Sequence, residues 1–195
     1  MEHKARVLCS NAARGNIHGV LQAFKDGADI NSTDGSGMTP LCRAAYNGNL
    51  EMVEFLCSYG ADLNRRDIWG RTSLRIAAAK GHARIIQHLA RQGADSSIPD
   101  WTGCPPLFAA AYSGHINAAA VLLEFGASAL QTSTLLVASS ENLRETPAHE
   151  ELVTPIWAAQ TQGHTAMEQL LLQKAEYLQS PAPAMKVAGA PVMPL

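Results

Sequence analysis

The chain has 195 residues, of which 47% are apolar and 16% are charged, and its formal net charge is −2. This length and apolar content are enough for one folded core and exclude disorder over the whole chain. No apolar run approaches the roughly 18 to 20 residues that a membrane-spanning helix needs, and the N-terminus lacks the apolar stretch of a signal peptide. We therefore expect a soluble protein of the cytoplasm or the nucleus, with no membrane partner.

The charges and cysteines exclude further classes of protein. The near-neutral balance disfavours nucleic acid as a partner, because phosphate binding needs a concentrated basic face. The charge is nonetheless uneven, since residues 61–100 carry seven basic and four acidic side chains, whereas residues 101–195 carry three and seven. No Cys-x-x-Cys pair occurs among the four cysteines, so neither a disulfide framework nor a zinc site is predicted.

Glycines that recur every 33 residues organise the chain. One series comprises Gly15, Gly48, Gly81 and Gly114, and a second comprises Gly27, Gly60, Gly93 and Gly126. The same spacing relates three aspartates, Asp34, Asp67 and Asp100, and four leucines, Leu8, Leu41, Leu74 and Leu107. A period of this length indicates a repeat protein whose units stack on one another.

One unit of the repeat predicts two helices and a turn. Residues 39–48 predict a short helix that Thr39 caps and Gly48 ends. Residues 50–59 predict a second helix, because their apolar side chains recur at helical spacing. Residues 61–70 predict an extended link that turns back at its Asp and Gly residues. Each repeat is therefore expected to be an antiparallel helix pair with a protruding hairpin.

These motifs resemble the ankyrin repeat family. A Thr-Pro-Leu opening occurs at residues 39–41, a Gly-His pair separates helices at Gly81-His82, Gly114-His115 and Gly163-His164, and Gly-Ala-Asp follows the second helix at 27–29, 60–62 and 93–95. The resemblance implies an all-α repeat solenoid of stacked helix-turn-helix units with short β-hairpin tips. It also implies that Asn31 and Asn64 bridge neighbouring hairpins.

The phase of the motifs divides the chain into five repeats, an insert and a tail. Four units follow in register, and the fifth Gly-His pair comes 49 residues after the fourth rather than 33, so 16 residues are inserted. We expect a cap-like repeat at 2–31, repeats at 37–66, 70–99 and 103–130, a long finger loop at 131–153, a cap-like repeat at 154–178 and a disordered tail at 179–195.

Residues capable of catalysis or metal binding occur, but we expect structural roles for them. His82, His115 and His164 would stack on one another, yet they occupy the structural Gly-His position of the family. Cys9 and Cys42 belong to adjacent repeats about one helix diameter, ~10 Å, apart, which is too far for a disulfide. We therefore expect no catalytic residue, no metal and no cofactor. The enzyme alternative would depend on three residues of the insert, His149, Glu150 and Glu151.

The resemblance implies that a protein partner binds the concave strip formed by the hairpin tips and the first helices. Aromatic and arginine side chains dominate interface energetics, and several map to this strip by their phase. We expect the partner to contact Tyr46, Arg66, Ile68, Trp69, Arg71, Lys80, Trp101 and Tyr112. Because Arg66 and Lys80 add positive charge, we expect acidic residues around an apolar anchor in the partner. In the alternative, Trp69 and Trp101 fold onto neighbouring hairpins and shield the stack.

We therefore predict a non-catalytic scaffold or adaptor for protein–protein interaction that is monomeric before binding. The alternative is an inhibitory or chaperone-like regulator that masks a surface of a client protein. Phosphorylation of hydroxyls in the insert would switch such a regulator. The candidate hydroxyls are Thr132, Ser133, Thr134, Ser139, Ser140 and Thr146.

Overall fold

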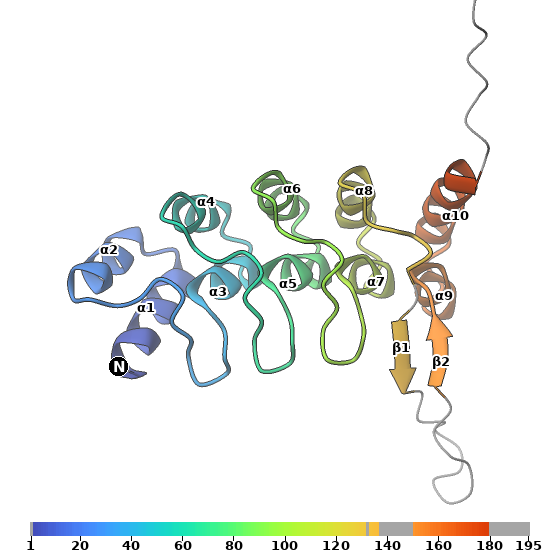
Figure 1. Cartoon of the computed structure of the whole chain (residues 1–195). Helices are drawn as coiled ribbons and strands as arrows, with labels where there is room; N and C mark the ends of the chain where they lie inside the picture. The colour runs from blue at the N-terminus through green and yellow to red at the C-terminus, as the bar shows by residue number, and fades with distance from the viewer. Residues whose placement is uncertain (1, 132, 137–149, 180–195) are drawn as a thin grey trace, which may run out of the picture.

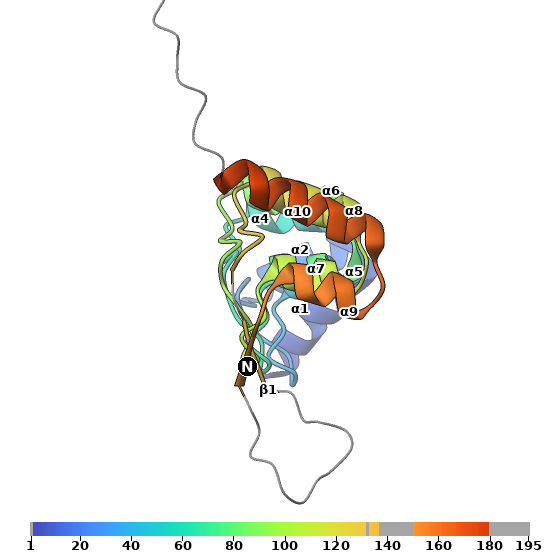
Figure 2. The same ribbon diagram turned by 90° about the vertical axis from the view of Figure 1, so that its right-hand side faces the viewer.

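The computed structural model describes residues 2–131, 133–136 and 150–179, and in these ranges it contains five stacked helix pairs (Figure 1). The pairs are α1 (Glu2–Arg14) with α2 (Ile17–Lys25), α3 (Pro40–Tyr46) with α4 (Leu50–Ser58), α5 (Ser73–Lys80) with α6 (Ala83–Arg91), α7 (Pro106–Tyr112) with α8 (Ile116–Glu124), and α9 (Pro155–Thr161) with α10 (Thr165–Gln179). The first helix of each pair lies in one layer and the second helix in another (Figure 2). The predicted all-α repeat solenoid is confirmed.

The helices begin where the sequence places good caps. The side chains of Thr39, Thr72 and Thr154 each accept a hydrogen bond from the backbone N–H three residues later, at the start of α3, α5 and α9. Asn16 and Asn49 do the same for α2 and α4. Pro105 stands at the equivalent position before α7 and caps no N–H with its side chain. The repeated Thr therefore fixes where most first helices start, and the stack tolerates its loss once.

Identical residues at the 33-residue spacing form the core. Leu8, Leu41, Leu74 and Leu107 are buried, as are Ala12, Ala45, Ala78 and Ala111. The small alanines let neighbouring first helices pack closely, and the leucines belong to the same buried cluster. The residues that carry the period are thus the residues that hold adjacent repeats together.

The glycine after each first helix has a conformational role and a packing role. Gly48, Gly81 and Gly114 all adopt the left-handed conformation, with φ between 72° and 75°. A Cβ at Gly48 would also lie 2.6 Å from the ring of His82 in the next repeat. These positions therefore require glycine both for the turn and for the approach of the neighbouring imidazole.

Three loops, called fingers here, project from the helical layers on the side of the first helices (Figure 1). Finger 1 spans residues 28–38, finger 2 spans 61–71 and finger 3 spans 94–104; all three consist of turns without strands. The expected bridges are present, since the side-chain oxygens of Asn31 and Asn64 accept the N–H groups of Asp62 and Asp95 at 2.8 and 3.0 Å. The fingers are therefore hairpin-like loops, and the expected β-structure is not found in them.

The described strands belong to the insert. Strand β1 (Ser133–Leu136) pairs antiparallel with β2 (Glu150–Val153), with Ser133 opposite Val153. The segment 131–153, predicted as a long finger loop, therefore contains two paired strands, one near each of its ends. Several residues singled out in the sequence lie outside the described ranges, namely Thr132, Ser139, Ser140, Thr146 and His149, together with residues 180–195.

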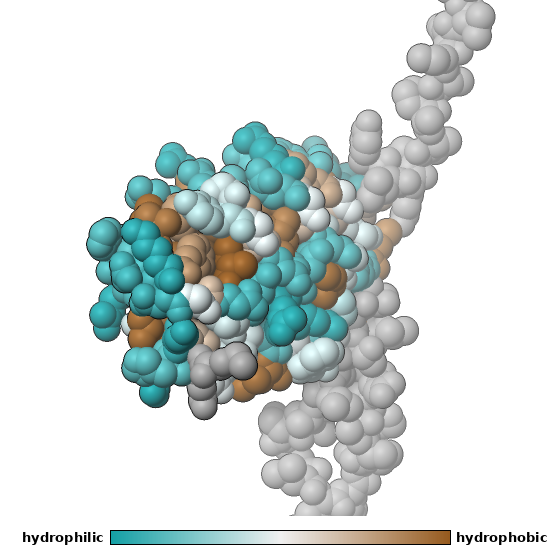
Figure 3. All heavy atoms as spheres, turned by 60° about the vertical axis from the view of Figure 1, so that its left-hand side comes forward, coloured by the Kyte–Doolittle hydropathy of each residue, from teal (hydrophilic) through white to brown (hydrophobic). Residues whose placement is uncertain are grey.

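On the face that Figure 3 presents, apolar patches lie among hydrophilic side chains. Among the described residues, no helix has both the length and the apolar character needed to cross a membrane.

Candidate partner-binding face

Each of the three fingers is closed by one aspartate. Oδ1 of Asp34 accepts hydrogen bonds from the backbone N–H groups of Ser36 and Met38 at 2.9 and 3.2 Å. Asp67 and Asp100 make equivalent contacts in fingers 2 and 3, to Trp69 and Arg71 and to Thr102 and Cys104. A carboxylate that accepts the N–H groups two and four residues later holds the turn in one conformation. The Asp at this spacing therefore sets the shape of each tip.

The other oxygen of each aspartate pairs with an arginine. The Nη2 atoms of Arg43, Arg71 and Arg75 lie 2.6, 2.7 and 2.6 Å from Oδ2 of the three carboxylates. Arg75 differs from the other two, because it reaches from α5 to Asp100 in the next repeat. Burial acts to raise the pKa of Asp34, but hydrogen bonds from Ser36 and Arg43 hold that pKa below its ordinary value. These three arginines are thus largely neutralised.

The two tryptophans of fingers 2 and 3 are both exposed, but they are held differently. Trp69 stands 49% exposed, with the guanidinium carbon of Arg71 4.3 Å from its ring centre. Trp101 is 63% exposed, yet its Nε1 donates to the carbonyl of Ile68 and its backbone N–H to that of Trp69. The alternative in which the rings fold onto a neighbouring finger therefore applies in part to Trp101, whose indole lies against Gly70 and Arg66 of finger 2 while the residue remains 63% exposed.

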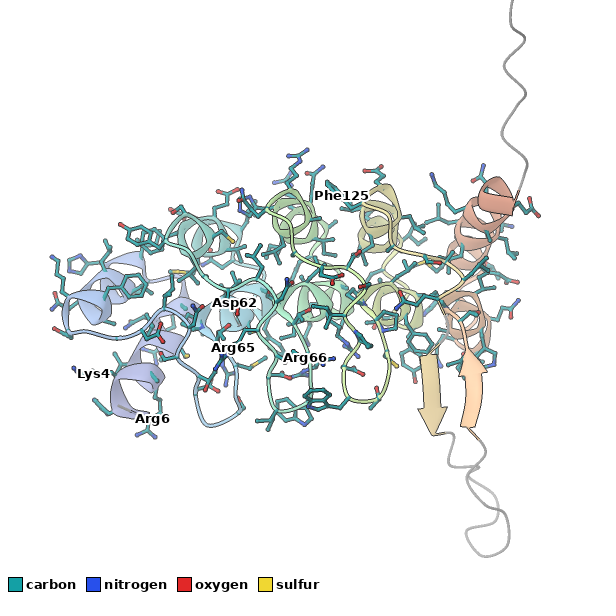
Figure 4. The ribbon with its side chains drawn as sticks, viewed as in Figure 1. Lys4, Arg6, Asp62, Arg65, Arg66 and Phe125 are labelled. Carbon is teal, nitrogen blue, oxygen red and sulfur yellow. The ribbon has the colours of Figure 1, made fainter. Side chains whose placement is uncertain are left out.

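Arg66 joins finger 2 to finger 3, a role that the sequence does not reveal. Its Nε donates to the carbonyl of Gly70 at 3.0 Å, its Nη2 donates to the carbonyl of Pro99, and its guanidinium carbon lies 4.1 Å from the ring centre of Trp101. Figure 4 shows the side chain between these two fingers. Within the described residues Arg66 forms no ion pair, so its positive charge is not cancelled by a carboxylate.

The ends of the first helices carry the remaining predicted residues. Tyr46 and Tyr112 are both exposed, and Ile68 at the tip of finger 2 is exposed as well. Lys80 Nζ lies 4.4 Å from the ring centre of Tyr46, while the ring of Tyr112 stacks on that of Phe108. Six of the eight predicted residues thus form three cation–aromatic pairs. Ile68 is joined to Trp101 through its carbonyl, whereas Tyr112 stacks on Phe108 apart from these pairs.

Two hollows lie between first helices and were missed by the sequence prediction. The apolar hollow, of about 270 Å³, is lined by Arg75, Ala79, Cys104, Phe108, Ala109, Tyr112 and Ser113. The polar hollow, of about 440 Å³, is lined by Arg6, Cys9, Ser10, Ala13, Asp34, Gly35, Ser36 and Arg43. The sequence does carry a signal for these hollows, because one repeat position alternates between a small and a large residue. The residues at this position are Ala13, Tyr46, Ala79 and Tyr112.

The histidines and cysteines occupy structural positions. The ring nitrogens of His82 and His164 lie 3.4 and 3.2 Å from the carbonyl oxygens of Tyr46 and Tyr112, so each imidazole contacts an earlier repeat. Burial raises the pKa of the Cys9 thiol to about 12, which keeps the thiol protonated and unreactive. In the part of the chain that the structure describes, no three His, Cys, Asp or Glu side chains are arranged to hold a metal ion.

The comparison with protein families agrees with this architecture. A family model described as ankyrin repeats (3 copies) matches residues 8–100 and residues 67–133. A comparison with curated proteins gives no match. The two matched ranges together span more than half of the 195 residues, including the three fingers and helices α3 to α8. The chain belongs to the ankyrin repeat family.

Proposed function

We propose that this chain is a non-catalytic adaptor that holds a protein partner on the face formed by its fingers and first helices. Ankyrin repeats are generally protein–protein interaction modules, and proteins built from them are typically non-catalytic. The proposal assigns the contact surface to fingers 2 and 3 and to the adjoining ends of α3, α5 and α7.

The observation that carries the proposal is the exposure of large side chains on this face. Ile68, Trp69 and Trp101 are 57%, 49% and 63% exposed at the tips of two adjacent fingers. Isolated exposed apolar residues are ordinary, but a contiguous group that includes two tryptophans is typical of an interface. Both rings are already held by arginines, so binding would sacrifice little side-chain entropy.

The charge on this face supports an acidic partner. Arg66 and Lys80 each lie over an aromatic ring, and neither has a carboxylate partner within the described residues. A partner segment with acidic residues around an apolar anchor would match the two uncancelled charges and the exposed rings beside them.

A quantitative affinity capture from native cell extract tests the proposal, with the full chain as bait. The Trp69→Ala/Trp101→Ala variant should lose the specific partner set that the wild type captures. Phe125→Ala is the matched control, because Phe125 is an exposed aromatic residue at the end of α8, in the second-helix layer (Figure 4). Circular dichroism and the thermal midpoint establish that both variants fold. Retention of the same partners by the folded double variant would contradict the proposal.

A further inference from the structure

One position of the repeat alternates between small and large side chains. Ala13, Tyr46, Ala79 and Tyr112 follow one another at intervals of 33 residues. Tyr46 and Tyr112 are exposed, whereas Ala13 lines the polar hollow and Ala79 lines the apolar hollow. The two hollows therefore occur two repeats apart, with the exposed ring of Tyr46 between them.

The junction between the hollows is filled by larger side chains. Ile76 of α5 is buried in a small cluster with Met38 and Cys42, and Lys80 lies over the ring of Tyr46. At the next junction the residue equivalent to Ile76 is Ala109, which lines the apolar hollow. The alanine in place of a β-branched residue at this repeat position leaves part of the space in the apolar hollow.

The apolar hollow suits a single large apolar side chain. Phe108 and Tyr112 form one wall, and the two alanines, Ala79 and Ala109, leave the space open. Arg75 at its edge is held by Asp100 at 2.6 Å, so it brings little uncancelled charge. The hollow has a volume of about 270 Å³. A large apolar side chain of a partner fits this space.

The polar hollow is lined by more charged and hydroxyl-bearing side chains than the apolar hollow. Arg6 and Arg43 flank it, with the hydroxyl-bearing residues Ser10 and Ser36 beside them. Arg43 is paired with Asp34, whose side chain is only 9% exposed and whose oxygens already accept hydrogen bonds within finger 1. Arg6, on the finger side of α1, forms no ion pair in the described part of the chain (Figure 4). One positive charge is left over, which favours a carboxylate.

We propose, on the basis of the function proposed above, that the partner binds as an extended segment with an acidic side chain in the polar hollow and a large apolar side chain in the apolar hollow. Packed helices lie about 8–10 Å apart, so hollows two repeats apart are separated by about 20 Å. An extended chain rises about 3.3 Å per residue, so about six residues cover this distance. An even spacing also places both side chains on the same side of the segment.

An extended segment fits this face better than a helix does. The exposed ring of Tyr46 stands between the two hollows, and a helix with its side chains is about 10–12 Å wide. A single extended strand passes the ring and still directs one side chain into each hollow.

A displayed library of random twelve-residue peptides, selected on the full chain, tests the spacing. We expect the enriched peptides to share an acidic residue and a large apolar residue at positions i and i+6. Failure to enrich any peptide, or enrichment of peptides without this pair, would overturn the proposal.

Two filling variants then test each hollow with one enriched synthetic peptide. Ala79→Tyr and Ala13→Tyr should each weaken binding at least tenfold, because they place in the hollow the residue that repeats 2 and 4 carry at the same position. The fold already accommodates Tyr there, as Tyr46 and Tyr112 show. Ala120→Tyr is the matched control, since Ala120 is a partly exposed alanine of α8 in the second-helix layer. Tyr112→Ala removes a wall of the apolar hollow, so it should also weaken peptide binding although it does not fill the hollow.

The charge of the polar hollow has a separate test. Arg6→Gln should weaken the acidic peptide about tenfold and leave its amide analogue unchanged, so the effect reports on the carboxylate alone. Unchanged affinity in the filling variants and in Arg6→Gln would contradict this mode of binding. If those variants also keep the cellular partners that the Trp69→Ala/Trp101→Ala variant loses, the proposed function stands and the two-hollow inference falls.

Discussion

The junction between fingers 2 and 3 differs from that between fingers 1 and 2, although both are built on the same repeat backbone. At the second junction Arg66 donates to one carbonyl in finger 2 and to one just before the tip of finger 3, and Trp101 donates to two carbonyls of finger 2. At the first junction, Asn31 receives the N–H of Asp62, and Ile68 lies against Gly37.

The difference shows which residues give this ankyrin stack its individual surface. The asparagine bridge occurs at both junctions, because Asn64 receives the N–H of Asp95 just as Asn31 receives that of Asp62. Arg66 and Trp101, which are not repeated at the 33-residue spacing, add the further hydrogen bonds between the tips. The two residues that differ from their counterparts in the other repeats, Arg66 and Trp101, therefore link fingers 2 and 3 at their tips. We call these two linked fingers the platform.

The largest expected effect concerns the core that both junctions share. Leu74→Ala should lower the free energy of unfolding by about 2–5 kcal/mol, because Leu74 is fully buried in the core that runs through the repeats. Urea denaturation followed by circular dichroism measures the change. A loss below about 1 kcal/mol would contradict the assigned phase of the repeat.

A second, smaller effect distinguishes the fingers themselves. Asp67→Ala should destabilise the chain by about 2–3 kcal/mol, because it leaves two backbone N–H groups without a hydrogen-bond acceptor and the guanidinium of Arg71 without its carboxylate partner. Asp34→Ala should have the weaker effect, because Asp34 is partly exposed and Asp67 is not. Thermal denaturation of the two variants gives the order, and the reverse order would be inconsistent with the observed burial.

Much of the fold, but less of the site, is predictable from the sequence. The period and the caps such as Thr39 are local features, so they predict the helix pairs directly. The eight candidate contact residues follow from their phase, but the partners of Arg66 do not, because carbonyl groups are present at every residue and only the tertiary structure selects two of them. The hollows depend on differences such as Ile76 against Ala109, whose effect emerges only when neighbouring helices are packed together.

Removal of the Arg66 side chain should leave the junction between fingers 2 and 3 with fewer hydrogen bonds, as at the junction between fingers 1 and 2. Arg66→Ala should cost about 1 kcal/mol of stability and should speed hydrogen exchange at the backbone N–H of Trp101, which donates to Trp69 in finger 2. Arg65→Ala is the matched control, because Arg65 is the adjacent exposed arginine (Figure 4). Equal exchange in both variants would show that Arg66 does not hold the platform together.

The smallest expected effect is a pH dependence at finger 1. The pKa of Asp34 in the folded chain lies below its ordinary value of 3.8, so its ionised form stabilises the fold above that pH. This contribution is lost as the pH falls below 3.8 and through the lower pKa of the folded state. The stability difference between the wild type and Asp34→Asn should therefore stay constant from pH 7 to pH 5 and shrink at lower pH. A difference that grows on acidification would contradict the sign of the shift.

Site-specific photo-crosslinking tests whether a partner binds at the finger tips. A benzoylphenylalanine side chain is placed at Trp69 in one sample and at Phe125 in another, and each folded chain is irradiated in native cell extract. We expect a discrete crosslinked partner from position 69 and none of that partner from position 125. Crosslinking of the partner from position 125 alone would place the interface on the second-helix layer and overturn the proposed binding face.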